Sequence, residues 1–241
     1  MKDGWANRKW REILTDGRAL QMKDNAMKEQ TRQRAESMEE GYDMMEIGKQ
    51  DALLVIDVQN DFLPQGSLAV AGGERVVPVI NRISGCFETR VFTRDWHPVD
   101  HISFSREPHL VDKSWPVHCV QNSWGAQFHP DLIIRPGDRI VSLGENQQEE
   151  NYSGFHGTDL AEWLNRCNVS RVYIAGLATE YCVFNSAADG QDAGFQIRVI
   201  EDAIAGVDVP QGSAALALQK LRERGVRIIC SGELTCRNHG A

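Results

Sequence analysis

Reactive side chains follow three short apolar runs of this chain. Asp57 ends the run 52–57, Asp95 directly follows the run 89–94, and Cys182 comes shortly after the run 171–176. In an open parallel sheet, ligands bind outside the carboxyl ends of the strands, so these three groups would converge on one crevice. An acid, a metal-type cluster and a thiol in one crevice make a hydrolase the leading hypothesis.

The metal-type cluster begins at Asp95 and includes His97 and His101, all within seven residues. Two imidazoles and one carboxylate form a facial ligand set that leaves positions open for water or substrate. Zinc or iron fits such a set, and manganese is an alternative. His118 is a candidate for a further ligand or for a group that orients one. Surface histidines in a loop are the simpler alternative, because an isolated Asp-x-His motif is a weak signal.

Cys182 is predicted to lie in the first turn of a helix that follows Gly176, with Thr179 as its N-cap. The positive end of a helix dipole lowers the pKa of a thiol placed there. The unpaired N–H groups of the same turn are suited to stabilise a tetrahedral oxyanion. The alternative is a small apolar side chain packed under the sheet.

Asp57 ends a hydrophobic strand, and partial desolvation there is expected to raise its pKa. A carboxyl with a raised pKa suits the exchange of a proton with a thiol and then with a leaving amine. A structural aspartate in a helix cap or turn is the alternative.

Apolar strand-like runs alternate with amphipathic helical segments from residue 51 onward. This alternation predicts βαβ units and a parallel sheet covered on both faces. The long segment 96–136 lacks regular periodicity, and such segments inside a domain are usually functional. The predicted strands are 52–57, 89–94, 139–143, 171–176, 196–201 and 226–230, and the predicted helices are 74–86, 157–167, 180–193 and 211–224.

The composition sets limits on partners and compartment. The 241 residues suffice for one domain with an appendage, and the net charge of −8 argues against nucleic acid as a partner. No apolar run approaches the length of a membrane span, and no secretory signal is recognisable, so a cytoplasmic location is expected. The six scattered cysteines form no C-x-x-C pair. We therefore expect mostly buried or half-buried thiols rather than a disulfide scaffold.

Residues 1–50 differ from the rest, since they hold all six methionines and many charges but few aliphatic side chains. They are interpreted as a polar, partly helical extension, with an arm for a partner or for oligomerisation as the alternative. The hydrolase domain is then expected over 51–232, and 233–241 is expected to be a frayed C-terminal tail.

Taken together, these motifs resemble the nicotinamidase/pyrazinamidase branch of the isochorismatase-like cysteine hydrolases. Other branches of that superfamily lack the D-x-H-x-x-x-H cluster seen at 95–101. The matching segments, in order, are 57–62, 66–70, 93–98, 100–101, 115–120, 128–130, 151–155 and 176–183.

The resemblance implies a three-layer α/β/α fold and the hydrolysis of nicotinamide to nicotinate and ammonia, a step of NAD salvage. It implies that Cys182 attacks the carboxamide carbon to form a thioester, while Asp57 shuttles the proton. The amides of Ala178 and Cys182 would form the oxyanion hole, with a cis peptide at Leu177–Ala178.

The resemblance also assigns a ligand set and a pocket. One divalent ion, held or bordered by Asp95, His97, His101 and His118, would anchor the pyridine nitrogen. A small aromatic pocket for a flat heteroaromatic amide would be lined by Phe62, Leu68, Trp115 and Tyr152. The oligomeric state stays open, although homo-oligomers are frequent in the family.

One position departs from the family pattern. The family's catalytic lysine precedes a glycine a few residues ahead of the Tyr-Ser-Gly-Phe segment, and Leu143 stands at that place here. Loss of the ammonium is expected to raise the pKa of Asp57 and to weaken thiolate formation. Loss of one such contact costs ~3 kcal/mol, or on the order of 10²–10³ in rate.

The departure keeps two further hypotheses open. A catalytically degenerate family member would bind a small aromatic ligand, or serve as a scaffold, without turnover. An amidase or isochorismatase-type hydrolase of another substrate is the other alternative, and loss of activity on metal removal would favour the nicotinamidase branch over it.

Overall fold

The computed structural model describes residues 44–110 and 114–237. Apart from its last residues, the predicted N-terminal extension lies outside this part of the chain, as do 111–113 and 238–241. Met45 to Ala241 form one compact unit. None of the helices within the described ranges has the length and apolar content needed to cross a bilayer.

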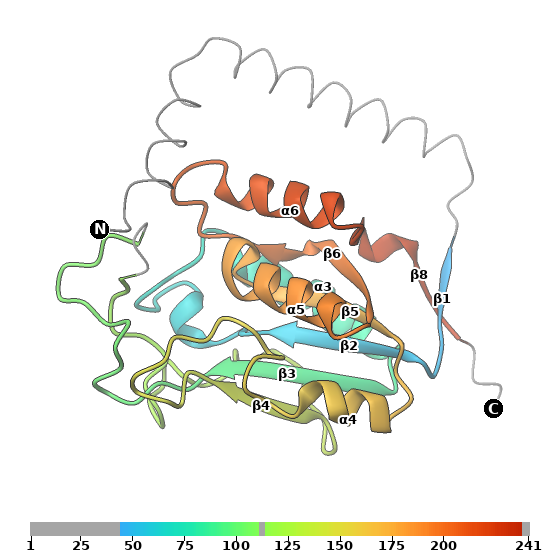
Figure 1. The fold of residues 1–241 in the computed structure, drawn as a ribbon, viewed down its shortest axis with the longest axis horizontal. Helices are drawn as coiled ribbons and strands as arrows, with labels where there is room; N and C mark the ends of the chain where they lie inside the picture. The colour runs from blue at the N-terminus through green and yellow to red at the C-terminus, as the bar shows by residue number, and fades with distance from the viewer. Residues whose placement is uncertain (1–43, 111–113, 238–241) are drawn as a thin grey trace, which may run out of the picture. The chain divides into compact units, whose positions relative to one another are not determined.

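A six-stranded parallel sheet forms the centre of this unit (Figure 1), with the strand order β4-β3-β2-β5-β6-β7. Every residue of the central strand β2 is buried, which explains its uninterrupted apolar run. All six predicted strands are confirmed, with shifts of a few residues at their ends. The strands are β2 (Asp51–Ile56), β3 (Thr89–Asp95), β4 (Arg139–Leu143), β5 (Arg171–Leu177), β6 (Gln196–Ala205) and β7 (Arg227–Ile229).

Helices cover both faces of the sheet, as the alternating pattern predicted. One face packs against α3 (Val76–Ser84), which Figure 1 shows behind the sheet. The other packs against α4 (Leu160–Arg166), α5 (Phe184–Asp192) and α6 (Ser213–Glu223). The three-layer α/β/α architecture is therefore confirmed.

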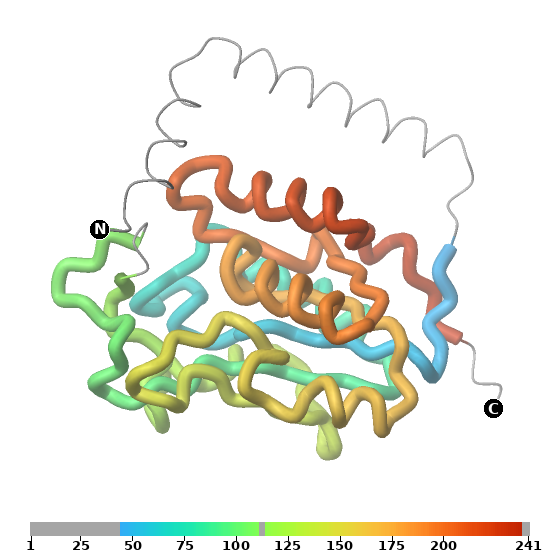
Figure 2. The backbone as a smooth tube through the Cα atoms, viewed as in Figure 1, coloured from blue at the N-terminus to red at the C-terminus, as the bar shows by residue number. Residues whose placement is uncertain are grey.

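A second, two-stranded sheet was not predicted. The strands β1 (Met45–Ile47) and β8 (Leu234–Cys236) pair in parallel, and Figure 2 shows the two segments side by side. A disulfide between Cys86 and Cys236 joins β8 to the segment that follows α3.

The expected limits of the domain are corrected accordingly. Residues 45–47 belong to the compact unit rather than to the extension, and 234–236 form a paired strand rather than a frayed tail. The expectation of unpaired thiols is wrong for Cys86 and Cys236. Three-residue strands are too short to show a period, and no pattern in the sequence relates two cysteines 150 positions apart.

The end of β5 depends on Gly176. Its φ of +112° lies in a region that side chains with a Cβ avoid, and a Cβ there would lie 2.0 Å from the carbonyl oxygen of Ile56. The pairing of β5 with β6 also shifts register between Ile174 and Gly176. Gly176 thus allows β5 to approach β2 closely at the point where the chain turns toward Cys182.

Candidate active site

The carboxyl ends of the strands gather the candidate catalytic groups. Asp57 follows β2, Asp95 ends β3, and Cys182 lies in a π-helical turn (Thr179–Val183) after β5. A carboxylate oxygen of each aspartate and the Cys182 sulfur lie within 4.8 Å of one another. The crevice that the strand pattern predicted is therefore formed.

Asp57 is fully buried, directly after β2, and its φ is +46°. Thr93 Oγ1 donates a hydrogen bond of 2.5 Å to Asp57 Oδ1. Among the described residues, Asp57 Oδ2 has no hydrogen-bond partner within ordinary geometry. Burial, followed by the charge of Asp95, raises the pKa of Asp57 to about 8. The predicted direction is confirmed, and the carboxyl favours its protonated form at neutral pH.

The electrostatic environment of Cys182 differs from the prediction. Burial raises the pKa of the Cys182 thiol well above its usual value, and the charges of Asp57 and Asp95 act in the same direction. Ala178, rather than Thr179, precedes the turn, and no side chain caps it. The predicted lowering of this pKa is wrong, because 5% exposure and two facing carboxylates outweigh a single turn of aligned peptides.

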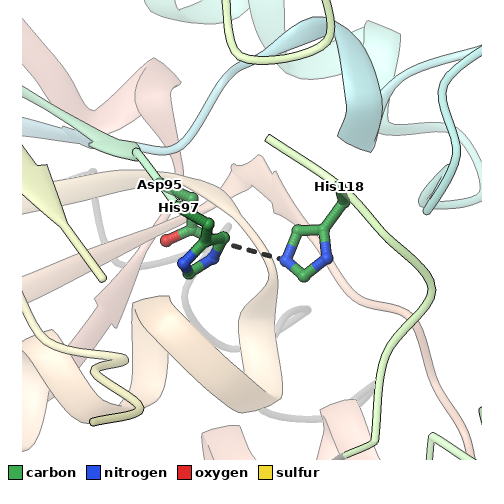
Figure 3. Close-up of side chains that lie close together, drawn as sticks. All are labelled: Asp95, His97 and His118. Atoms are coloured by element: carbon green, nitrogen blue, oxygen red, sulfur yellow. Dashed lines mark ion pairs between the residues drawn. The ribbon is translucent and has the colours of Figure 1, made fainter. Parts of the chain in front are cut away.

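Asp95, His97 and His118 form a compact trio, shown in Figure 3. Asp95 Oδ2 lies 3.4 Å from His97 Nε2 and 3.6 Å from His118 Nε2. Burial acts to raise the pKa of Asp95, but the charges and hydrogen bonds of the two histidines hold it below its usual value. The carboxylate is therefore ionised in the pH range where the imidazoles are available as ligands.

The hydrogen bonds of the two imidazoles fit a metal site. His97 Nδ1 donates to the Gly144 carbonyl oxygen at 3.2 Å, and His118 Nδ1 donates to the Pro116 carbonyl oxygen at 2.8 Å. Each Nδ1–H is thus directed at a backbone acceptor, which leaves Nε2 with its lone pair on the side of Asp95. This pattern orients histidine ligands in metal sites. A divalent ion of the zinc or iron type fits this donor set.

His101 lies beside the trio rather than within it. Its ring centroid is 4.3 Å from that of His97, and it forms a second group of potential ligand atoms with His97 and Glu150. The backbone N–H of Ser103 donates to His101 Nδ1 at 3.3 Å, and His101 Nε2 donates to the Glu149 carbonyl oxygen at 3.1 Å. Both of its nitrogens are therefore engaged by the protein.

A pocket that is partly open to solvent adjoins these groups. The four residues that the resemblance assigned to it (Phe62, Leu68, Trp115 and Tyr152) line it together with Asp95, His118, Ala178 and Cys182. Trp115 Nε1 donates a 2.7 Å hydrogen bond to the Tyr152 hydroxyl, which fixes the two rings relative to each other. The lining combines aromatic rings with the polar groups of Asp95, His118 and Cys182. Flat, partly polar rings fit such a lining.

Leu143 ends β4 in register with Asp95 and is 1% exposed. It belongs to the same cluster of buried apolar side chains as Cys182. An uncharged side chain therefore stands next to the candidate catalytic groups, at the position where the resemblance calls for an ammonium. Lys113, the nearest lysine in sequence to the pocket segment 115–120, lies outside the described residues.

Sequence reasoning missed three residues of this region. Tyr181 and Val207 line the pocket, and the Tyr181 ring meets that of Trp115 edge-on, with centroids 4.9 Å apart. Glu150 contributes a potential ligand atom beside His97. Tyr181 adjoins Cys182 in sequence and could have been found by that adjacency. Val207 and Glu150 lie on irregular segments, where no periodicity indicates the direction of a side chain.

The comparisons with known proteins agree with this geometry. Residues 51–233 match the model of the isochorismatase domain family. A nicotinamidase of Acinetobacter baylyi is 38% identical over 75% of this chain and 92% of its own length. A pyrazinamidase of Pyrococcus horikoshii in complex with zinc is 39% identical, with a TM-score of 0.65 over 75% of this chain and 99% of its own. A structure from L. infantum in complex with nicotinate is 35% identical, with a TM-score of 0.73 over 80% of this chain and 100% of its own.

The cis peptide at Leu177–Ala178, which the resemblance implied, is present. A family match over most of the chain, relatives above 30% identity and the same fold lead to one conclusion. The chain belongs to the isochorismatase-like hydrolase family, in its nicotinamidase/pyrazinamidase branch.

Proposed function

We propose that this protein is an amidohydrolase of the nicotinamidase type, which converts nicotinamide to nicotinate and ammonia. The observation that carries the proposal is the approach of Cys182, Asp57 and Asp95 to within 4.8 Å beside an aromatic pocket. A nicotinate-bound and a zinc-bound relative support the substrate class and the metal dependence.

In the proposed reaction, Cys182 Sγ forms a bond to the amide carbon while its proton passes to Asp57. Backbone N–H groups of Ala178 and Cys182 stabilise the oxyanion, as such donors do in acyl transfer. Collapse of the tetrahedral adduct breaks the carbon–nitrogen bond, and Asp57 returns the proton to the departing ammonia. Water then hydrolyses the thioester, which releases the acid and restores the thiol.

A divalent ion would be held by Asp95, His97 and His118, with His101 at its border. Bound there, it would supply a Lewis-acid anchor for the ring nitrogen of the substrate. The chain's own groups set the rest of the binding geometry, since Phe62 lies on the same pocket as Asp95 and His118. The donor set fits zinc, iron or manganese.

The test is ammonia release from nicotinamide by the metal-loaded protein, compared with Cys182→Ala. We expect release by the native chain and none by the variant, because Cys182 is the only thiol among the described residues that line the pocket. Absence of release by the native chain from nicotinamide, pyrazinamide and related ring amides would contradict the proposal.

A second function is favoured by Leu143, which leaves a protonated Asp57 beside an undissociated thiol. On this alternative the pocket binds a small aromatic acid or amide without turning it over. Calorimetric binding of nicotinate, together with no ammonia release until Leu143 is replaced by lysine, would support it. Robust turnover by the native chain would remove it.

A further inference from the structure

A partly buried carboxylate outside the predicted ligand set lies next to the metal trio. Glu150 lies in the loop after β4, two residues before Tyr152. One ligand atom each of His97, His101 and Glu150 lie within 4.8 Å of one another. Glu150 Oε2 is shielded from solvent and, among the described residues, has no hydrogen-bond partner. A shielded carboxylate oxygen without a hydrogen bond, beside imidazole nitrogens, is suited to bind a cation.

This group and the Asp95 trio share the imidazole of His97. Because His97 Nδ1 donates to the Gly144 carbonyl oxygen, only Nε2 has a lone pair to offer, and it faces Asp95. One lone pair binds one ion. The two groups of ligand atoms are therefore two sides of a single site rather than two separate sites.

His101 and Glu150 lie on the same side of the site, and of the two only Glu150 has a potential ligand atom without a hydrogen bond to the described residues. His101 Nδ1 accepts from the Ser103 N–H, and its Nε2 donates to the Glu149 carbonyl oxygen. This second bond holds the backbone next to Glu150, so His101 positions the loop that carries the carboxylate. Glu150 Oε2, by contrast, has no hydrogen bond to any residue that the structure describes.

We propose that Glu150 is a ligand of the divalent ion and completes the set Asp95, His97, His118 and Glu150. Two carboxylates and two neutral imidazoles neutralise a divalent charge in a buried site, which favours retention of the ion. The inference rests on the metal site of the proposed function and deepens it.

The test compares Glu150→Gln with Glu145→Gln in the full chain. Glu145 is an exposed carboxylate in the same loop and serves as the matched control. After removal of metal by a chelator, each protein is titrated with Zn²⁺ by calorimetry, and the visible absorption of the Co²⁺ form is recorded. We expect Glu150→Gln to bind Zn²⁺ at least ten-fold more weakly, with shifted Co²⁺ bands, and Glu145→Gln to match the native chain.

Two results would overturn the assignment. Unchanged Zn²⁺ affinity in Glu150→Gln would show that the carboxylate is not a ligand. Weaker binding with unchanged Co²⁺ bands would show that Glu150 acts only through its charge. If Glu150→Gln does not fold, X-ray absorption of the native zinc protein decides: two coordinated imidazoles support the proposed set, and three contradict it.

These measurements do not require turnover. If the protein hydrolyses no amide but shows the expected metal binding, the assignment of Glu150 is supported and the proposed function is contradicted. If the protein releases ammonia but Glu150→Gln leaves zinc binding unchanged, only the assignment of Glu150 is contradicted.

Discussion

Asp57 occupies the least solvated position of the candidate site. Its carboxyl is fully buried, it accepts a hydrogen bond from Thr93, and it faces both Asp95 and the Cys182 thiol. The raised pKa of about 8 suits the step in which a proton returns to ammonia. It opposes the first step, in which the same carboxyl must accept a proton.

This opposition predicts the pH dependence of the reaction. The ionised form of Asp57 accepts the thiol proton, and a raised pKa means that this form accumulates only as the pH rises through about 8. Below that pH, kcat/KM for nicotinamide should fall about ten-fold per pH unit. The profile of kcat/KM between pH 5.5 and 9.5 measures this limb. A rate that is flat or falls from pH 6 to 8 would contradict the assignment of Asp57 as the base.

Leu143→Lys should restore the charge that this chain lacks. An ammonium at the end of β4, beside Asp95 and among the side chains that pack on Cys182, lowers the pKa of Asp57. We expect the acidic limb of the pH profile to move to lower pH and kcat to rise, with an upper bound on the order of 10²–10³-fold. Leu143→Met is the control, because it keeps the volume without the charge. An unmoved limb in Leu143→Lys, with correct folding, would show that the lysine position does not act on Asp57.

The predicted roles of single residues differ in how far the sequence could support them. Motif spacing located Asp57, Asp95, His97 and Cys182, because each follows a strand whose apolar run is unmistakable. The sign of the pKa shift at Cys182 was missed, since it depends on burial and on carboxylates brought from two other strands. The burial of Cys182 and its distances to the two carboxylates are set only when the sheet forms.

At the scale of elements, the turn after β5 determines the site. Gly176 lets β5 pass against β2, and the π-helical turn 179–183 then presents Cys182 to the pocket. Turns of this kind are rare and occur frequently at functional sites. The precision of the site therefore depends on one glycine outside the pocket.

Gly176→Ala tests this dependence, with Gly194→Ala as a matched control. Both glycines have positive φ, +112° and +94°, but a Cβ at 176 would lie 2.0 Å from a backbone oxygen, whereas a Cβ at 194 meets nothing within 4 Å. Gly194→Ala should lower the free energy of unfolding by about 1–2 kcal/mol, the cost of left-handed backbone. Gly176→Ala should cost roughly 3 kcal/mol or more and reduce turnover as well. Equal losses in urea unfolding would show that steric approach plays no part.

Strands and helices were predictable where they were long and buried. The central strands were located because parallel strands covered on both faces have continuous apolar runs. The strands β1 and β8 were missed because, unlike the equally short β7, they stand outside the alternation of strands and helices, and because they pair with each other across almost the whole described chain. The loop that carries Glu150 was missed for a related reason, since irregular backbone has no repeat from which a side-chain direction can be inferred.

At the scale of the whole molecule, one covalent link restrains most of the compact unit. The disulfide Cys86–Cys236 closes a loop with a sequence separation of 150 and joins β8 to the end of α3. Cys86 lies shortly before β3 begins, so the link is at the amino ends of the strands. The candidate catalytic groups lie at the opposite, carboxyl ends.

Reduction should therefore affect stability rather than catalysis. The chain-entropy relation for a loop of this length gives roughly 5 kcal/mol of stabilisation. Denaturant unfolding of the native chain with and without dithiothreitol measures the loss, and Cys236→Ser should reproduce it without responding to the reductant. Initial rates of ammonia release should be equal in both states. A reductant-sensitive rate in Cys236→Ser would point to Cys182 as the source of the response.

The sequence predicts a cytoplasmic location, where Cys86 and Cys236 would stay unpaired. The structure instead joins the two residues in a disulfide. A reducing cytoplasm keeps most thiols unpaired. Thiol counting in protein prepared without reductant, before and after unfolding, shows which condition prevails. The positions of the six cysteines in the sequence do not indicate this disulfide, because Cys86 and Cys236 approach to 4.5 Å between Cα atoms only in the folded state.

The pairing of β1 with β8 also has a consequence for biosynthesis. Met45 leaves the ribosome early, but its partner Leu234 is translated only after all six strands of the larger sheet. Until then the backbone groups of 45–47 that face β8 have only solvent to bond with, whatever the state of the larger sheet. Closure of this small sheet therefore comes after synthesis of the whole larger sheet, and the bond at Cys236 can form only once every strand of that sheet has been translated.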